Sequence, residues 1–225
     1  MRLEVPDIDT DNIEMSIESI TLTQVATSPT TEGRHRIGIL GGTFNPPHLG
    51  HLLMAEQVGN QLELDEVWFM PTASPPHAPG KKTIDSMHRV EMVQLAIEDN
   101  PLFKLQPYEV FKGGKNYTVD TMSYFVEAFP QSDFYFIIGA DSANELFTWR
   151  NIDKLVNLVQ FVGIRRPGEK PYEDVYPIIW VDSPLVDISS TEIRLRVYLE
   201  QSIKYQVPKT VEEYIKLNQL YCAEY

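Results

Sequence analysis

Two histidines, His48 and His51, follow a glycine turn and stand at the start of a segment with helical spacing. The turn, Gly41-Gly42, comes directly after the apolar run 37–40, which has the composition of a short buried strand. In such a turn backbone N–H groups can approach a phosphate, and the helix N-terminus adds about half a positive charge. Imidazoles at the same point can donate hydrogen bonds to phosphate oxygens on which negative charge develops during a reaction. The segment predicts a nucleotide phosphate site, of neither the G-x-G-x-x-G nor the P-loop type.

A second group of candidate residues lies near the C-terminus, in the run V-D-I-S-S-T-E-I-R-L-R over residues 186–196. Ser189 and Glu192 have the three-residue spacing of a capping box, which on its own marks a helix start. Ser190 and Thr191 would add hydroxyl and backbone donors at the positive end of that helix, and Arg194 lies one turn further on. The run therefore has two interpretations, a plain helix start or a cradle for a polyphosphate.

The composition restricts the class of protein. The chain has 225 residues, of which 43% are hydrophobic, and a formal net charge of −13. That charge argues against a nucleic-acid partner, which needs a basic stripe, but not against a nucleotide substrate. The single cysteine, Cys222, excludes an internal disulfide and a thiolate metal cluster. No apolar run approaches the ~20 residues of a membrane span, so we expect no membrane partner and a cytoplasmic location.

Apolar runs and helical periodicity alternate along most of the chain. Residues 1–34 are acidic and end in turn-forming residues, and they predict a flexible N-terminal extension. Residues 35–225 predict one doubly wound α/β domain with a mostly parallel sheet and a small helical part at the C-terminus. The expected strands are 37–40, 66–70, 103–105, 134–138, 161–164 and 178–181, and the expected helices are 49–62, 86–98, 118–129, 190–202 and 208–220.

The two candidate groups occur together in a known superfamily. G-G-T-F-N-P-P-H-L-G-H at residues 41–51, followed by I-S-S-T-E-I-R at 188–194, resembles the nucleotidyltransferases marked by an H-x-G-H motif and an S-S-T-x-[IL]-R motif. More narrowly, the chain resembles bacterial nicotinate-nucleotide adenylyltransferases from residue 36 to the C-terminus. The narrower resemblance rests on W-F-M-P at 68–71, P-P-H at 75–77, H-R-V-E-M at 88–92, Y-T-V-D-T at 117–121, I-I-G-A-D at 137–141 and R-R-P-G at 165–168. It implies a Rossmann-like nucleotidyltransferase fold.

The resemblance also implies roles for individual residues. Many members carry Asp where this chain has Asn45, and the neutral amide removes a charge there. Many also carry Lys after the P-P-H histidine, where this chain has Ala78. Either Lys81 or Lys82 replaces that cation, or the acceptor phosphate relies on His77 and Arg89. The implied catalytic residues are His48, His51 and Arg194; the implied ATP-binding residues are Gly42, Thr43, Phe44, Asn45, Gly139, Asp141, Arg166, Ser190 and Thr191; and the implied acceptor-binding residues are His77, Arg89, Tyr117, Thr118 and Trp149.

The implied reaction is adenylyl transfer from ATP to nicotinate mononucleotide, a step of NAD biosynthesis, with Mg²⁺ bound mainly through the ATP phosphates. Tyr117, Thr118 and Trp149 favour a planar acceptor ring, because such a ring needs an aromatic face on which to stack. Other acceptors stay open, namely nicotinamide mononucleotide, phosphopantetheine or glycerol phosphate. A non-catalytic nucleotide-binding regulator is a further alternative, and a homo-oligomer is compatible with the sequence.

Overall fold

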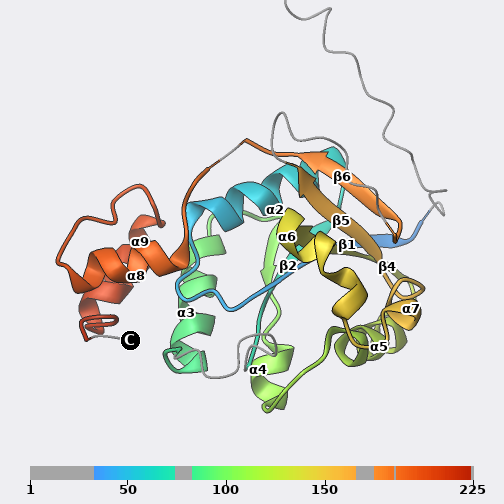
Figure 1. The fold of residues 1–225 in the computed structure, drawn as a ribbon, viewed down its shortest axis with the longest axis horizontal. Coiled ribbons are helices and arrows are strands. Elements are labelled where there is room, and N and C mark those ends of the chain that lie inside the picture. Colours follow the sequence, from blue (N-terminus) through green and yellow to red (C-terminus); the bar gives the residue numbers. More distant parts are fainter. Residues whose placement is uncertain (1–32, 74–82, 166–174, 185, 224–225) are drawn as a thin grey trace, which may run out of the picture. The chain divides into compact units, whose positions relative to one another are not determined.

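The carboxyl ends of six parallel strands meet at one edge of a single sheet (Figure 1). The structure is a computed structural model, and it describes residues 33–73, 83–165, 175–184 and 186–223. The strand order is β3-β2-β1-β4-β5-β6, so the order reverses between β1 and β4. Ligands of doubly wound folds bind outside the carboxyl ends at such a reversal. The strands are β1 (His35–Gly42), β2 (Glu66–Pro71), β3 (Phe103–Leu105), β4 (Ser132–Gly139), β5 (Gln160–Arg165) and β6 (Ile178–Asp182).

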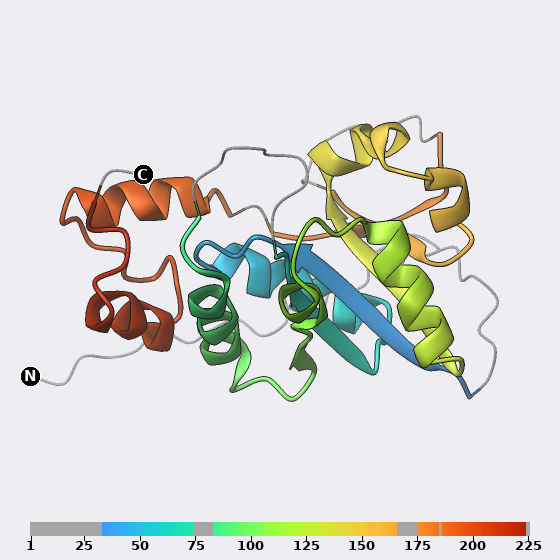
Figure 2. The same cartoon turned by 90° about the horizontal axis from the view of Figure 1, so that it is seen from below.

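Helices cover both faces of the sheet, because side chains along each strand alternate between them. In β4, Tyr135 and Ile137 join a core with α2 and α3, whereas Phe134, Phe136 and Ile138 join a core with α5 and α7. Figure 2 shows α2 and α5 on different sides of β1. The helices are α2 (Leu49–Gln61), α3 (Ser86–Ile97), α4 (Tyr108–Lys112), α5 (Thr118–Ala128), α6 (Ala140–Asn144), α7 (Ile152–Leu155), α8 (Ser190–Tyr198) and α9 (Lys209–Leu217), with a 3₁₀ turn η1 (Leu146–Thr148).

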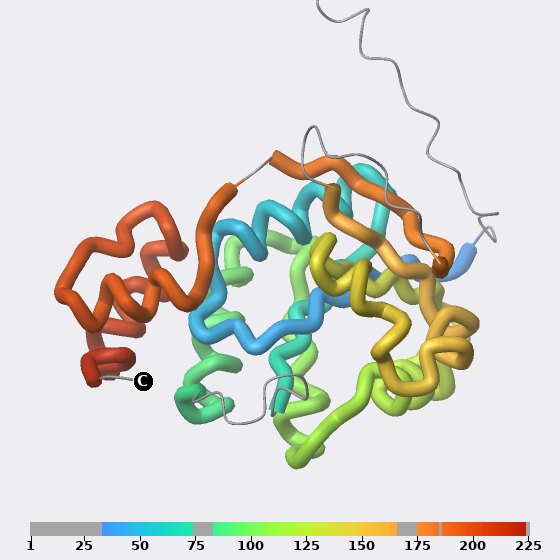
Figure 3. Tube along the Cα trace, in the orientation of Figure 1, coloured from blue at the N-terminus to red at the C-terminus, as the bar shows by residue number. Residues whose placement is uncertain are grey.

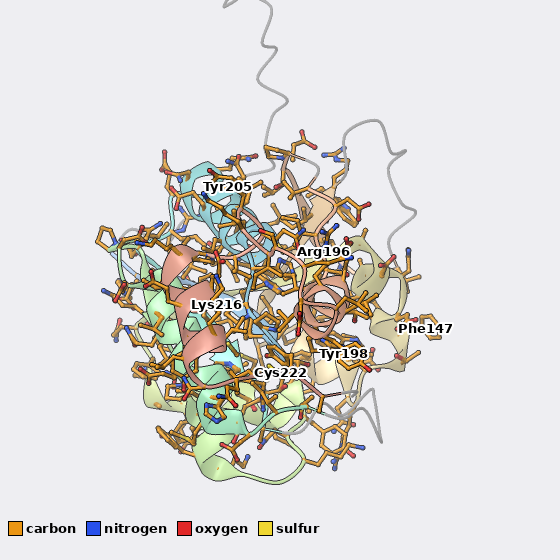
Figure 4. The ribbon with its side chains drawn as sticks, turned by 90° about the vertical axis from the view of Figure 1, so that its left-hand side faces the viewer. Phe147, Arg196, Tyr198, Tyr205, Lys216 and Cys222 are labelled. Atoms are coloured by element: carbon orange, nitrogen blue, oxygen red, sulfur yellow. The ribbon has the colours of Figure 1, made fainter. Side chains whose placement is uncertain are left out.

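The C-terminal helices extend the core rather than forming a separate one. Ile193 of α8, together with Val211 and Ile215 of α9, belongs to the same buried cluster as α2 and α3. The trace in Figure 3 shows α9 beside α3, which it contacts. Tyr198 and Tyr205, labelled in Figure 4, are exposed side chains of this helical part. The helical part therefore brings the S-S-T-E-I-R segment to the sheet edge.

All six expected strands and all five expected helices are present, so the doubly wound prediction is confirmed. Helix 190–202 was predicted too long, since α8 ends at Tyr198 and Glu200 has a left-handed backbone with φ of 55°. Four short elements, α4, α6, η1 and α7, were not predicted. The predicted flexible extension, 1–34, lies outside the described residues except for its last two. In the part of the chain that the structure describes, no helix has both the length and the apolar character needed to cross a bilayer.

Candidate active site

The two histidines form the start of α2 and touch each other. His48 is the N-cap residue, and its backbone N–H donates to Nδ1 of His51 at 3.2 Å. The two imidazole centroids lie 3.7 Å apart with the rings tilted by 33°. A Cβ on Gly50 would stand 3.1 Å from two atoms of the His48 ring, so glycine between the histidines allows this ring to lie over the backbone. The H-x-G-H spacing thus produces a compact imidazole pair at a helix N-terminus.

Burial favours the neutral form of both imidazoles. Burial lowers the pKa of His48 from 6.5 to about 4. Burial, followed by repulsion from His48, lowers the pKa of His51 well below its ordinary value. Because Nδ1 of His51 accepts a hydrogen bond, we assign its proton to Nε2, which makes that atom a donor. The ring is thereby set to donate to an incoming oxygen.

The turn that precedes the histidines is shaped by close aromatic packing. Phe44 is buried and has a left-handed backbone, with φ of 48°. Its ring meets the edge of the His51 ring at a centroid distance of 5.0 Å and an angle of 68°. A Cβ on Gly42 would come within 3.0 Å of the same phenyl ring, so only glycine fits there without a shift. Phe44 therefore supports His51 from within the protein.

Side chains from three distant parts of the chain hold this turn. Arg89 of α3 donates to the carbonyl oxygen of Thr43 at 2.8 Å, and Arg194 of α8 donates to that of Asn45, also at 2.8 Å. The hydroxyl of Tyr221 donates to Oδ1 of Asn45 at 2.8 Å in a buried contact. Groups from α3, α8 and the C-terminal segment thus hold the turn that precedes the histidines.

The second motif docks against the first. Ser189 caps α8 by accepting a hydrogen bond from the N–H of Glu192 at 3.1 Å, which confirms the predicted helix start. The hydroxyl of Ser190 donates to the carbonyl oxygen of Pro46 at 2.8 Å. Arg194 also contacts the hydroxyl of Thr191, at 3.3 Å. The N-termini of α2 and α8 are therefore tied to one turn, an arrangement suited to an anion of several charges.

Two adjoining cavities open at this edge of the sheet. The first, of about 430 Å³, is lined by residues that include Gly42, Thr43, His51, Thr118 and Trp149. The second, of about 350 Å³, is lined by residues that include Gly50, Asp141, Arg165 and Asp187. Met54 and Gly139 line both. The H-x-G-H segment thus borders both cavities, with His51 on one and Gly50 on the other.

Several predicted site residues lie behind these cavities rather than on them. Arg89 is 1% exposed, with its guanidinium on the carbonyl oxygens of Thr43 and Ala73, and burial lowers its pKa. Asn45 is also 1% exposed and faces Tyr221. In this structure both support the turn from within. The predictions for His77 and Arg166, and the alternatives at Ala78, Lys81 and Lys82, concern residues outside the described part of the chain.

Two residues of the first cavity were not singled out from the sequence. Glu109 of α4 is buried and accepts a hydrogen bond from the hydroxyl of Thr121 at 2.8 Å. Burial raises the pKa of Glu109, and the hydrogen bond from Thr121 opposes this. Asn116 is also buried, and its amide donates to the carbonyl oxygens of Glu109 and Gly113. The available signal was Thr121, a hydroxyl among the apolar positions of α5 that needed a buried partner.

The strand order, the site at the carboxyl edge and the two docked motifs define a nucleotidyltransferase of the α/β class. A family model described as cytidylyltransferase-like matches residues 39–196. A relative from Lactiplantibacillus plantarum, named "Probable nicotinate-nucleotide adenylyltransferase", is 55% identical over 89% of this chain and 95% of its own length. The nicotinate-nucleotide adenylyltransferase of Bacillus subtilis is 47% identical over 83% of this chain and 98% of its own. The chain belongs to the cytidylyltransferase-like family and, within it, to the nicotinate-nucleotide adenylyltransferases.

Solved structures agree at the level of fold. Plasmodium falciparum nicotinic acid mononucleotide adenylyltransferase in complex with NaAD aligns with a TM-score of 0.72 and 24% identity, over 84% of this chain and 98% of that one. The same enzyme in complex with APC aligns with a TM-score of 0.70 and 23% identity, over the same shares of the two chains. At these identities the likeness shows the fold alone.

Proposed function

We propose that this chain transfers the adenylyl group of ATP to nicotinate mononucleotide, giving nicotinate adenine dinucleotide and pyrophosphate. The observation that carries the proposal is a pair of adjoining cavities that meet at the H-x-G-H helix start. A reaction that joins two mononucleotides needs two sites whose phosphate ends converge on one set of donors. The names of the relatives and the NaAD complex of the solved structure support the same reaction.

ATP is assigned to the second cavity and to the two helix starts. Asp141, which lines that cavity, supplies carboxylate oxygens suited to ribose hydroxyls. The triphosphate is assigned to the turn between the N-termini of α2 and α8. There Arg194 and Ser190 are held against the turn by hydrogen bonds to Asn45 and Pro46, and the hydroxyl of Thr191 accepts from Arg194.

The acceptor is assigned to the first cavity. Trp149, which lines it, packs edge-on against Phe136 and Phe161 at centroid distances of 5.8 and 6.0 Å, so its indole is held in place. A fixed indole gives a pyridine ring a surface on which to stack. Thr118 starts α5 beside it and adds the positive end of that helix. These features favour an aromatic acceptor over phosphopantetheine or glycerol phosphate.

The proposed chemistry is positioning and charge stabilisation. The acceptor phosphate oxygen attacks the α-phosphorus of ATP and pyrophosphate leaves. Since that nucleophile is already an anion at neutral pH, the step needs no general base. His51, through its Nε2–H, and the guanidinium of Arg194 would donate to the oxygens on which charge develops.

A magnesium ion fits this site as a companion of ATP. Among the described residues no group of three or more His, Cys, Asp or Glu side chains can hold a metal. The hydroxyls of Thr43 in the turn, and of Ser190 and Thr191 at the start of α8, suit an ion carried by phosphate oxygens and water. When bound, Mg²⁺ would neutralise charge on the leaving pyrophosphate. A cytoplasmic location and a homo-oligomeric state remain predictions.

The test is pyrophosphate release by the purified protein with Mg·ATP and four acceptors offered separately. We expect turnover with nicotinate mononucleotide far above that with nicotinamide mononucleotide, phosphopantetheine or glycerol phosphate. Turnover only with one of the other acceptors would keep the nucleotidyl transfer and overturn the acceptor assignment. Binding of ATP without turnover of any acceptor would instead support a nucleotide-binding regulator.

A further inference from the structure

Two cations share one partly buried aromatic ring, that of Tyr117. The guanidinium carbon of Arg150 lies 4.4 Å from the ring centroid of Tyr117, and Nζ of Lys115 lies 5.0 Å from the same centroid. The hydrogen bond and charge of Lys115, and then the charge of Arg150, lower the pKa of Tyr117. Both cations are exposed, and no ion pair joins either to a carboxylate among the residues that the structure describes. We call Lys115, Tyr117 and Arg150 the cationic rim.

Lys115, Tyr117 and Arg150 line neither cavity themselves, but their neighbours in the chain line the first cavity, which is assigned to the acceptor. Asn116 and Thr118, the two neighbours of Tyr117 in the chain, line the first cavity. Trp149, the neighbour of Arg150, lines it as well. The contact of Arg150 with Tyr117 therefore joins the segment after η1 to the loop before α5, and both stretches supply lining residues of the first cavity.

The charges inside this part of the cavity make the rim significant. Glu109 lines the cavity, and burial raises its pKa while its hydrogen bond with Thr121 and the charge of Lys112 lower it. An ionised Glu109 would repel a ring that carried a carboxylate, unless positive charge nearby offset this repulsion. In a chain with a net charge of −13, two cations that pair with no carboxylate in the described part of the chain make the local field more positive.

We propose that Lys115 and Arg150 select acceptors whose ring carries a carboxylate over those whose ring carries the corresponding carboxamide. The two mononucleotides differ at that one group, so the rim acts on the difference between them. A unit charge near the protein surface, close to a carboxylate but not in contact with it, changes the binding of that carboxylate by about threefold to tenfold and leaves a neutral amide nearly unchanged. This inference rests on the function proposed above.

The test is the ratio of kcat/KM for nicotinate mononucleotide to that for nicotinamide mononucleotide. We expect Arg150→Gln and Lys115→Gln each to lower this ratio by about threefold to tenfold, mainly through a higher KM for the acid. The effect should shrink in 0.3 M KCl, because salt screens exposed charges. Lys204→Gln is the matched control, since Lys204 makes the same kind of contact, 5.1 Å from the ring of Tyr205, while neither Lys204 nor its chain neighbours line either cavity; it should leave the ratio unchanged.

The outcomes separate the inference from the proposed function. If the wild-type protein turns over neither mononucleotide, the proposed function fails. If the wild-type protein prefers the acid but Arg150→Gln and Lys115→Gln keep its ratio, only the inference fails. The inference also fails if both variants lose activity equally toward the two acceptors, because the rim would then have only a structural role in joining two segments that line the cavity. Tyr117→Phe, which keeps the ring under both cations, should retain most of the preference.

Discussion

The hydrogen bond between Tyr221 and Asn45 gives the most direct test of how the turn before the histidines is held. Tyr221 is 2% exposed and Asn45 is 1% exposed, and 2.8 Å separates the tyrosine hydroxyl from Oδ1 of Asn45. Nδ2 of Asn45 is buried without a hydrogen-bond partner, so the amide depends on this contact. Tyr221→Phe would leave Oδ1 unpaired in the same buried place.

Leaving a buried acceptor unpaired costs about 1–3 kcal/mol. For a domain of this size we expect the melting temperature to fall by about 3–9 °C. The catalytic activity of Tyr221→Phe should change less than its stability. Arg89, Arg194 and Ser190 still hold the backbone of the turn, so we expect kcat/KM for pyrophosphate release to fall by less than about tenfold.

Equilibrium urea unfolding of Tyr221→Phe beside the wild-type protein measures this cost. Tyr214→Phe is the matched control from the same C-terminal region, because the hydroxyl of Tyr214 lies 2.9 Å from Nδ1 of His88 in a partly exposed contact. We expect that control to lose less than about 1 kcal/mol. A free energy of unfolding for Tyr221→Phe within about 0.5 kcal/mol of wild type would refute the reasoning, since this is the range of an ordinary surface change.

Four further predictions concern the histidines and the metal. Because burial lowers the pKa of His48 from 6.5 to about 4, the unfolded chain binds more protons between these values. The contribution of neutral His48 to the free energy of unfolding is therefore complete above pH 6.5 and is about 2 kcal/mol smaller at pH 5. Urea titrations of the wild-type protein and of His48→Gln, above pH 6.5 and at pH 5, would show this loss. His51→Ala should lower kcat by ~10²–10³ in the pyrophosphate assay, and near-full turnover would exclude its role as a donor. Gly50→Ala places a Cβ 3.1 Å from the His48 ring and should lower kcat/KM by about tenfold, with little change in melting temperature. Chelation of Mg²⁺ should stop turnover but leave the melting temperature of the protein alone unchanged, whereas a lower melting temperature would point to a metal held by the protein.

The fold could be predicted from the sequence because buried parallel strands are continuous apolar runs. Phe103–Leu105, the shortest strand, was located by its apolar ends, and the longer strand β4 by an unbroken apolar centre. The unpredicted helices α4, α6 and α7 have only four or five residues each, too few to show a helical period.

The candidate site could be predicted only where the chain itself brings residues together. His48 and His51 are three positions apart, so the motif alone places them at one helix start. The contact of Tyr221 with Asn45 spans 176 positions, and that of Arg89 with Thr43 spans 46. No local pattern records such pairings, which is why the support of the turn became visible only in three dimensions.

The direction of one hydrogen bond connects the motif with the kind of chemistry proposed for it. A histidine whose Nδ1–H donates to a carboxylate exposes a bare Nε2, which can take a proton from a nucleophile. His51 has the opposite arrangement, since its Nδ1 accepts the backbone N–H of His48 and its proton resides on Nε2. It is built to donate to an oxygen rather than to remove a proton. That arrangement suits a transfer whose nucleophile, a phosphate oxygen, is already an anion, and it would suit poorly a hydroxyl or amine nucleophile that needs a base.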